Sequence, residues 1–596
     1  TLTGSAALIQ VGDGSAAGAG YTATIANALV GSATLVKSDL GTLILSGTNS
    51  YGGGTRINGG VLQIERDENL GLGGALALDG GMLRTTGSFA TDRAIALGSG
   101  GGTFETAANS RLVANGQMTG GGALVKAGAG TLVLAEAASH SGGTTIAAGI
   151  LQIGNGGTTG SLVGDVTNAG SLAFARADTY VFAGRIAGAG SVSQAGGGTT
   201  VFTADHSYTG GTTIAGGTLQ IGNGGAGGSI VGDVANDGRL AFNRSNEYVF
   251  AGLISGSGSV DQAGAGTTIL TGDNSYKGET IVSAGTLLIE GDQSAVTGLT
   301  LVRAGTLGGT GTIGGDVSIL DGAVLAPGSD GPGTLTINGD LSFAGSARLG
   351  VEFGEANVVG GPLNDLVSVG GDLVLDGTVD IAVSAGGSFD IGVYRLIDYA
   401  GALTDNGLEV GSQPDGGDAF VQTSVEGRVN LVNTGGATLN FWDGAAGPKL
   451  DGTVNGGDGI WQGGAGNDNW ADASGTVNAG YSNGAFAIFS AAPGTVTIDD
   501  SLGAVAASGL QFASDGYVIT GDALTLSAAQ SVIRVGDGTA QGAGYSATIE
   551  AELTGAARLV KTDLGTLVLT GANSYSGGTR IEAGIVRISS DANLGA

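Results

Sequence analysis

Short apolar runs alternate with glycine-rich turns along almost the whole chain. The runs are rich in Val, Ile, Leu and Thr, as at Thr42–Leu45, Thr131–Leu134 and Thr566–Leu569. Apolar and β-branched runs of about three to six residues, bounded by Gly, Asn and Asp, are typical of short strands joined by tight turns. Glycine supplies 123 of the 596 residues, which leaves almost no stretch that could form a long helix. The pattern predicts an all-β protein.

The sequence repeats itself at two distances. Residues 29–64 return at 553–588 without a gap, 524 positions later, and 23 of the 36 aligned residues are identical. A shorter repeat relates Tyr180–Gly184 to Tyr248–Gly252, with an offset of 68 positions (248 − 180). Such repeats predict a solenoid, because stacked units bury a shared core that one unit cannot close. The second long copy stops with the chain, so we expect this chain to be a segment of a longer repetitive protein.

A parallel β-helix explains the shorter repeat most simply. A coil of three short strands and three turns takes about 20–25 residues, so the shorter repeat predicts three coils. We expect recurrent Leu, Ile and Val side chains to point inward, and Thr, Ser and Ala outward. The alternative fold, a set of antiparallel sandwiches, predicts hairpin dipeptides at a spacing of about 8–12 residues. Five copies of a stronger strand-turn-strand element centre on Leu43, Leu132, Thr200, Thr268 and Leu567.

The chain divides into four regions by their composition and predicted strand length, and the third of these, 437–500, holds all three tryptophans. We expect this third region to be an insert or a set of irregular coils. The regions are 1–300, a repetitive β-helix; 301–436, its continuation with longer strands; 437–500, the Trp-rich segment; and 501–596, further β-helix and the start of the second copy of the long repeat.

The recurrent element resembles the passenger-associated repeat of bacterial type V (monomeric) autotransporters. It reads Gly-Thr-Leu-x-Leu-(Ser/Thr)-Gly-x-Asn-Ser-Tyr-x-Gly-Gly-Thr-x-Ile at 41–57 and at 565–581. The stretches at 309–337 and 441–489 are also similar to passenger segments of this family. The resemblance implies a right-handed parallel β-helix (solenoid) with a Trp-rich irregular segment. It does not imply one activity, because adhesins, proteases and esterases share this scaffold.

The same resemblance implies a location, a function and partners. The full-length protein is expected at the bacterial cell surface, anchored to the outer membrane, as an adhesive passenger rod with a role in virulence. Expected partners are a host matrix protein, a cell-surface or glycan ligand, or another copy of the rod. The family's C-terminal translocating β-barrel has no counterpart before Ala596, so membrane contact is expected only through a barrel outside this segment. The alternative function is a carbohydrate-active β-helix, a polysaccharide lyase or glycosidase.

Charge and composition narrow the classes of ligand. The chain has 22 basic and 52 acidic residues, a net charge of −30, which argues against nucleic acid or anionic lipid as the main partner. It has no cysteine and therefore no disulfide, thiol nucleophile or thiolate zinc site. No apolar run approaches the length of a membrane helix.

Two histidines are the first candidates for chemistry. Aligned on the repeat, His140 takes the place of Tyr51, and His206 takes the place of Asn49. Both positions belong to the outer turn of the repeat, so we predict structural roles for both histidines.

Three motifs suggest sites but lack the context that each site needs. Gly480–Gly484 fits Gly-x-Ser-x-Gly, but no helix and no nearby histidine follow. Gly463–Trp470 has the form of one calcium-binding nonapeptide, whereas a calcium roll needs tandem copies. Asp499 and Asp500 are adjacent in a predicted strand region and therefore need not converge. We expect no catalytic, cofactor or metal site and no enzymatic activity.

The Trp-rich segment offers the candidates for partner binding. Aromatic side chains are common anchors in protein interfaces and carbohydrate sites. The alternative is that these rings fill the core where the coil pattern changes. The candidate residues are Trp442, Trp461, Trp470 and Tyr481.

Overall fold

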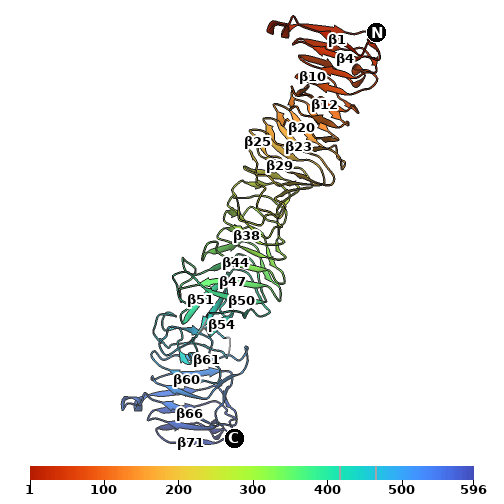
Figure 1. The fold of residues 1–596 in the computed structure, drawn as a ribbon. Coiled ribbons are helices and arrows are strands. Elements are labelled where there is room, and N and C mark those ends of the chain that lie inside the picture. Colours follow the sequence, from red (N-terminus) through yellow and green to blue (C-terminus); the bar gives the residue numbers. More distant parts are fainter. Residues whose placement is uncertain (415–417, 464–465, 596) are drawn as a thin grey trace. The chain divides into compact units, whose positions relative to one another are not determined.

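Short β-strands make up almost all regular structure of this computed structural model (Figure 1). The structure describes residues 1–414, 418–463 and 466–595. Within these ranges the helical elements are four short 3-10 helices: η1 (Ala16–Gly20), η2 (Asp67–Leu70), η3 (Gln541–Gly544) and η4 (Asp591–Leu594). The predicted all-β class is confirmed.

The chain forms two compact units. The first unit comprises residues 1–307 and 311–316, and the second comprises 308–310 and the chain from 317 onward. Each unit has its own stack of coils and is described by itself.

Each coil of the first unit places short strands on three faces. Strands of successive coils pair in parallel on each face, so that β16 pairs with β19, β17 with β20, and β18 with β21. This pairing satisfies the backbone donors and acceptors of interior strands. The predicted parallel β-helix is confirmed. The six strands are β16 (Leu124–Ala127), β17 (Thr131–Leu134), β18 (Ala137–Ala138), β19 (Thr144–Ile146), β20 (Ile150–Ile153) and β21 (Ser161–Leu162).

Inward side chains stack on the equivalent side chains of the neighbouring coils. Leu132 lies in register with Leu112 of β14 (Arg111–Ala114) and with Leu151 of β20, and all three are fully buried. Parallel strands lie about 4.8 Å apart, so each leucine contacts the leucines above and below it. Complete burial of such a side chain stabilises the fold by about 1.5–3 kcal/mol. The predicted inward direction of Leu132 is confirmed.

The shorter repeat spans three coils and one further strand, so the prediction of three coils was wrong. Register partners on one face run Leu124, Thr144, Val166 and Ile186, so three full coils after Leu124 end at Ile186. The next repeat copy begins six positions beyond Ile186, on the next face. The short turns explain the error, because a coil takes about 20 residues rather than about 23. The copies that follow one another therefore begin on three different sheets, with β16, β26 (Ser191–Gln194) and β35 (Ser259–Gln262).

A buried lysine holds one corner of the coil that contains β16. Lys126 points inward and is fully buried, and its Nζ donates to the carbonyl oxygens of Ala127, Gly128 and Ala148 at 2.7, 2.7 and 3.0 Å. Burial lowers the pKa of Lys126 to about 8, and the charge of Glu105 opposes this shift. The three carbonyl acceptors join two successive coils at this corner.

The corner residue varies together with the residue six positions later. The three copies with lysine have leucine there, and the two copies with glutamine have threonine. In one of the two glutamine copies, Thr200 Oγ1 donates to Gln194 Oε1 at 2.6 Å, which satisfies an acceptor that lysine does not carry. In the other copy, Gln262 Oε1 has no hydrogen-bond partner among the described residues. The pairs are Lys37 with Leu43, Lys126 with Leu132, Lys561 with Leu567, Gln194 with Thr200, and Gln262 with Thr268.

Longer coils open the second unit and end at antiparallel strands. β47 (Arg348–Phe353) pairs in parallel with β50 (Thr378–Val383), 30 positions later (378 − 348). β51 (Gly392–Tyr399) then pairs antiparallel with β55 (Arg428–Asn433), which pairs antiparallel with β54 (Ala419–Gln422). These strands end the parallel order of their sheet.

The Trp-rich segment starts the next run of coils in the second unit. β56 (Phe441–Trp442) pairs antiparallel with β58 (Trp470–Ala471) and in parallel with β60 (Phe486–Phe489). β57 (Gly459–Trp461) pairs in parallel with β61 (Thr495–Ile498). From β60 onward the parallel coils continue to β71 (Thr579–Ile581) and β72 (Ile585–Arg587).

The two copies of the long repeat fold alike. Asp39 and Asp563 both adopt a left-handed conformation, with φ of 66° and 65°. The carboxylate of each accepts a hydrogen bond from a glycine N–H 25 residues earlier, Gly14 at 2.9 Å and Gly538 at 3.0 Å. The sequence identity between the two copies therefore corresponds to the same local structure.

The corner pairs yield a stability prediction. Lys126→Gln places a buried amide oxygen beside Leu132 without a donor, so we expect the free energy of unfolding to fall by about 1–3 kcal/mol. Adding Leu132→Thr supplies the hydroxyl donor and recovers most of the loss. Urea unfolding followed by circular dichroism measures both variants, with Lys277→Gln at an exposed position as the control. Equal stability of the single and double variants would refute the pairing.

Candidate functional site

Three tryptophans form one aromatic cluster inside the second unit. Trp442, Trp461 and Trp470 are fully buried, and Tyr481 is 2% exposed. The Trp470 ring centroid lies 5.2 Å from that of Trp442, 5.0 Å from that of Trp461 and 4.4 Å from that of Tyr481. Phe489 of β60 packs against the cluster from the first parallel coil. The three indoles therefore belong to the core, and none of them faces solvent.

Buried polar groups fix the segment around this cluster. Trp442 Nε1 donates to the Gly457 carbonyl oxygen at 2.8 Å. The fully buried carboxylate of Asp443 accepts hydrogen bonds from Asn455 N at 2.7 Å and from Asn478 Nδ2 at 2.8 Å. These bonds connect turns far apart in the segment and hold its short strands over the coil below.

A recess lies beside the cluster, and Tyr481 is the candidate residue that lines it. Its volume is about 350 Å³. Phe420 and Leu439 add apolar surface, while Thr434 and Ser482 add hydroxyl groups. Tyr481 Oη donates to the Ala485 carbonyl oxygen at 2.6 Å, which fixes the ring. Aromatic and aliphatic walls with a few polar groups suit a peptide side chain or a sugar ring. The full lining is Asp418, Phe420, Thr434, Ala437, Leu439, Gly480, Tyr481 and Ser482.

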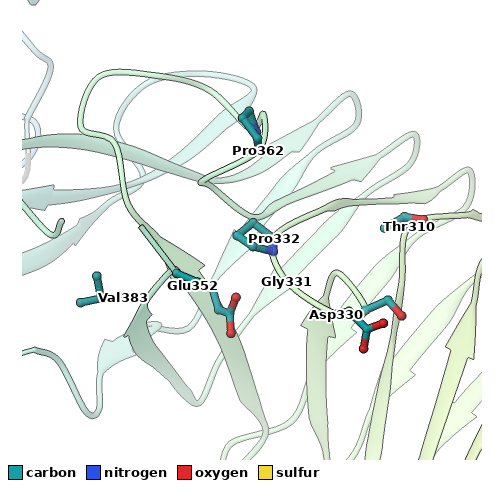
Figure 2. A pocket seen from close by; sticks show the side chains of 9 residues that line it. Thr310, Asp330, Gly331, Pro332, Glu352, Pro362 and Val383 are labelled. Carbon is teal, nitrogen blue, oxygen red and sulfur yellow. The ribbon is translucent and has the colours of Figure 1, made fainter. Parts of the chain in front are cut away.

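A larger cavity of about 780 Å³ opens among the loops of the long coils (Figure 2). Asp330 contributes a carboxylate from the loop before β45 (Thr334–Ile337), and Glu352 contributes another from β47. Pro332 and Pro362 also line this cavity. No lysine or arginine is present among the described residues that line this cavity.

Asp365 fixes the wall of this cavity. It is almost fully buried, and its carboxylate accepts hydrogen bonds from Gly333 N and Glu352 N, each at 2.7 Å. Burial raises the pKa of Asp365 to about 7, and the two backbone donors oppose this shift. Both oxygens are occupied by backbone groups, so the arrangement positions loops.

The structure buries both histidines in the core of the first unit, so their predicted place at an outer turn was wrong. His140 Nε2 lies 3.0 Å from Thr144 Oγ1, and His206 Nδ1 accepts a hydrogen bond from Ile186 N at 3.1 Å. Burial lowers the pKa of both rings. Neither ring lines the recess or the cavity described above.

The other sequence motifs are placed as follows. In Gly480–Gly484, Ser482 Oγ accepts a hydrogen bond from Leu439 N at 3.0 Å, and β60 follows rather than a helix. Of the nonapeptide-like Gly463–Trp470, residues 464 and 465 lie outside the described residues. Asp499 accepts a hydrogen bond from Gln462 Nε2 at 2.8 Å. Across the described chain, no group of three or more His, Cys, Asp or Glu side chains is placed to hold a metal ion.

The sequence is similar to one curated adhesin and to one family of passenger repeats. Over 368 residues the chain is 46% identical to the adhesin BmaC autotransporter of Brucella suis biovar 1 (strain 1330). The match covers 60% of this chain but 11% of that protein, so the chain spans a small part of the relative's length. Five segments match the passenger-associated transport repeat: 35–64, 124–153, 192–221, 260–289 and 559–588.

These matches confirm the five predicted repeat centres, since each segment contains one of them. The segments coincide with coils of the β-helix, as 124–153 runs from the start of β16 to the end of β20. Together with the similarity to an adhesin, they support a passenger segment of an adhesin-like autotransporter. No helix in the described parts of the chain has the length and apolar character needed to cross a membrane.

Two adjacent residues of β57 test the placement of the aromatic cluster. Trp461 is fully buried, whereas Ile460 points outward and is 47% exposed. We expect Trp461→Ala to lower the free energy of unfolding by about 3–5 kcal/mol because it leaves a large cavity. Ile460→Ala should change that free energy by about 0.5 kcal/mol or less. Denaturant unfolding measures both, and similar losses for the two variants would contradict the assignment.

Proposed function

We propose that this chain is an adhesive part of a bacterial surface protein and attaches the cell to host matrix, host cells, glycans or other bacteria. The similarity to an autotransporter adhesin over 368 residues supports this function most directly. Five passenger-associated transport repeats, folded as coils, support surface display outside the outer membrane.

Stacked coils suit adhesion because they repeat the same outer surface. Three successive repeat copies begin on three different sheets of the first unit. Equivalent outer surfaces therefore face three directions around the coil axis. Many weak contacts can then act together, with an avidity well above that of a single contact.

We place one partner contact at the recess beside Tyr481. Phe420 is half-buried and offers apolar surface to a partner group, and the exposed Asp418 lies at the rim of the recess. Leu439 and Tyr481, each 2% exposed, form the buried base of the recess. Trp442, Trp461 and Trp470 support this surface from the core. A net charge of −30 favours a partner with basic groups, and such attachment weakens as the salt concentration rises.

The cavity of Figure 2 is the place to test the alternative of a carbohydrate-active enzyme. It presents Asp330 and Glu352, but its described lining has no basic side chain to neutralise a uronate. We expect incubation with uronate-containing polysaccharides to release no new unsaturated ends. Their appearance, and their loss in Glu352→Gln, would favour the enzyme.

Beads coated with the purified chain test the adhesive function. We expect them to bind at least one of four targets, namely matrix proteins, epithelial cells, immobilised glycans or other beads coated with the chain, above the level of uncoated beads. Asp418→Lys should lower this binding about fivefold, because it reverses the charge at the recess rim, an effect of about 1 kcal/mol. Asp500→Lys makes the same charge change at an exposed position outside the recess and should have little effect.

The outcomes separate the function from the site. If coated beads bind no target better than uncoated beads, the adhesive function is wrong. If the wild-type chain and both variants bind equally well, the chain is adhesive but its contact does not lie at the recess.

A further inference from the structure

The two histidines of the first unit replace other residue types at repeated core positions. His140 occupies a position that holds tyrosine in the other four copies, and in all five the side chain contacts a threonine four residues later. His206 occupies a position that holds asparagine in three copies, where the amide oxygen accepts a backbone N–H at 2.7–2.8 Å. The equivalent tyrosines are Tyr51, Tyr208, Tyr276 and Tyr575, and the equivalent asparagines are Asn49, Asn274 and Asn573.

The hydrogen bond of His206 requires a neutral ring. Ile186 N donates to Nδ1 at 3.1 Å, so Nδ1 must carry a lone pair and the proton must sit on Nε2. If Nδ1 were also protonated, it would be a donor facing the Ile186 N–H donor, and this hydrogen bond would be lost. Asparagine at this position has no such restriction, because an amide oxygen does not become protonated between about pH 4 and 8.

The surroundings of His206 offer little solvation to a charged ring. The side chain is 3% exposed, and its ring centroid lies 4.3 Å from that of Phe202 and 6.3 Å from that of Phe182. Its Nε2 has no hydrogen-bond partner among the described residues. A buried imidazolium in such an aromatic setting is strongly disfavoured.

The charged neighbours of His206 have opposite effects on its pKa and partly cancel one another. The carboxylate of Asp205 favours protonation and the guanidinium of Arg185 opposes it. Arg244 lies 3.9 Å from Asp205 and weakens the effect of that carboxylate. Tyr208 contributes a neutral ring. Burial dominates and lowers the pKa of His206 to about 4.

His140 is a second ring of the same kind. It is fully buried, its Nε2 contacts Thr144 Oγ1, and its Nδ1 has no partner among the described residues. Burial lowers the pKa of His140, and a backbone hydrogen bond with Gly143 opposes this shift. Tyrosine at this position makes the same contact with threonine but stays neutral throughout the acid range.

We propose that His140 and His206 make the first unit acid-sensitive, so that protonation of either ring opens the coil that contains it. The charged ring leaves the core for water, and the stacked side chains above and below it lose their cover. The coil closes again at neutral pH. This device does not depend on which partner the surface binds.

The sign of the effect follows from linkage. The ring binds its proton more tightly in the open coil, where its pKa is near 6.5, than in the closed coil, where it is about 4. The stability that the neutral ring contributes is therefore present above about pH 6.5 and is lost as the pH falls toward about 4. Between pH 7.5 and pH 5, the open population around His206 rises roughly 25-fold.

Hydrogen exchange tests this proposal with a matched variant taken from the repeat itself. Peptides covering 180–215 are compared between the wild-type chain and His206→Asn at the same pH, so the intrinsic exchange rate cancels. We expect the ratio of the wild-type exchange rate to the variant exchange rate to be roughly 25 times larger at pH 5 than at pH 7.5. An unchanged ratio at the two pH values would overturn the proposal for His206.

Two further variants test the proposal from both directions. His140→Tyr should remove the acid-dependent exchange of residues 137–150. Asn274→His should create acid-dependent exchange around Ile254, whose N–H donates to Asn274 Oδ1 at 2.7 Å. If His206→Asn does not fold, Asn274→His still tests whether a buried histidine at this repeat position makes its coil acid-sensitive. Exchange around Ile254 that keeps its wild-type pH dependence would contradict the proposal.

Discussion

The inward side chains of each coil are covered mainly by the coils above and below, and this dependence shapes the rest of the structure. A strand of three or four residues cannot form a core, but Leu112, Leu132 and Leu151 in register form a continuous apolar stack. Every polar group inside that stack must find its partner in the same coil or the next one. Lys126 meets this requirement with three carbonyl oxygens, two from its own coil and one from the next.

The ends of a stack need a different solution, because the last coil lacks one neighbour. In the second unit the antiparallel strands β51, β55 and β54 end one run of coils, and the aromatic cluster covers the start of the next run. Large rings suit this place because they fill an irregular space over a single coil. The stacked core leaves the outer surface free to vary, and the proposed adhesive contacts lie there.

Much of the fold could be predicted from the sequence, because inward positions recur at constant spacing. The inward direction of Leu132 and the five repeat centres could be predicted for this reason. The number of coils in the shorter repeat could not be predicted, since a small difference in the length of each coil shifts the next copy to another face. Lysine occurs together with leucine, as at Lys126 and Leu132, and glutamine occurs together with threonine, as at Gln194 and Thr200. An alignment of the five repeat copies is enough to show this covariation.

The candidate site was less predictable. A tryptophan in sequence fits a binding surface and a core equally well, and its burial depends on neighbours such as Phe489 that the sequence does not place. The recess joins Phe420 to Tyr481, which are 61 positions apart (481 − 420) in segments without a common repeat. Contacts between such segments depend on turns and antiparallel pairing that no periodicity encodes.

The most direct test of the stacked register is a disulfide between two coils, because the chain has no cysteine of its own. Thr145 and Thr167 are parallel register partners on adjacent strands, β19 and β22 (Val166–Asn168). Strands about 4.8 Å apart lie within the range that a disulfide spans, so Thr145→Cys/Thr167→Cys should oxidise almost completely. Thr145→Cys/Val163→Cys, with the second cysteine in the turn between β21 and β22 and out of register with Thr145, should keep both thiols free. Free thiols in the first variant, or a disulfide in the second, would contradict the stacked coils.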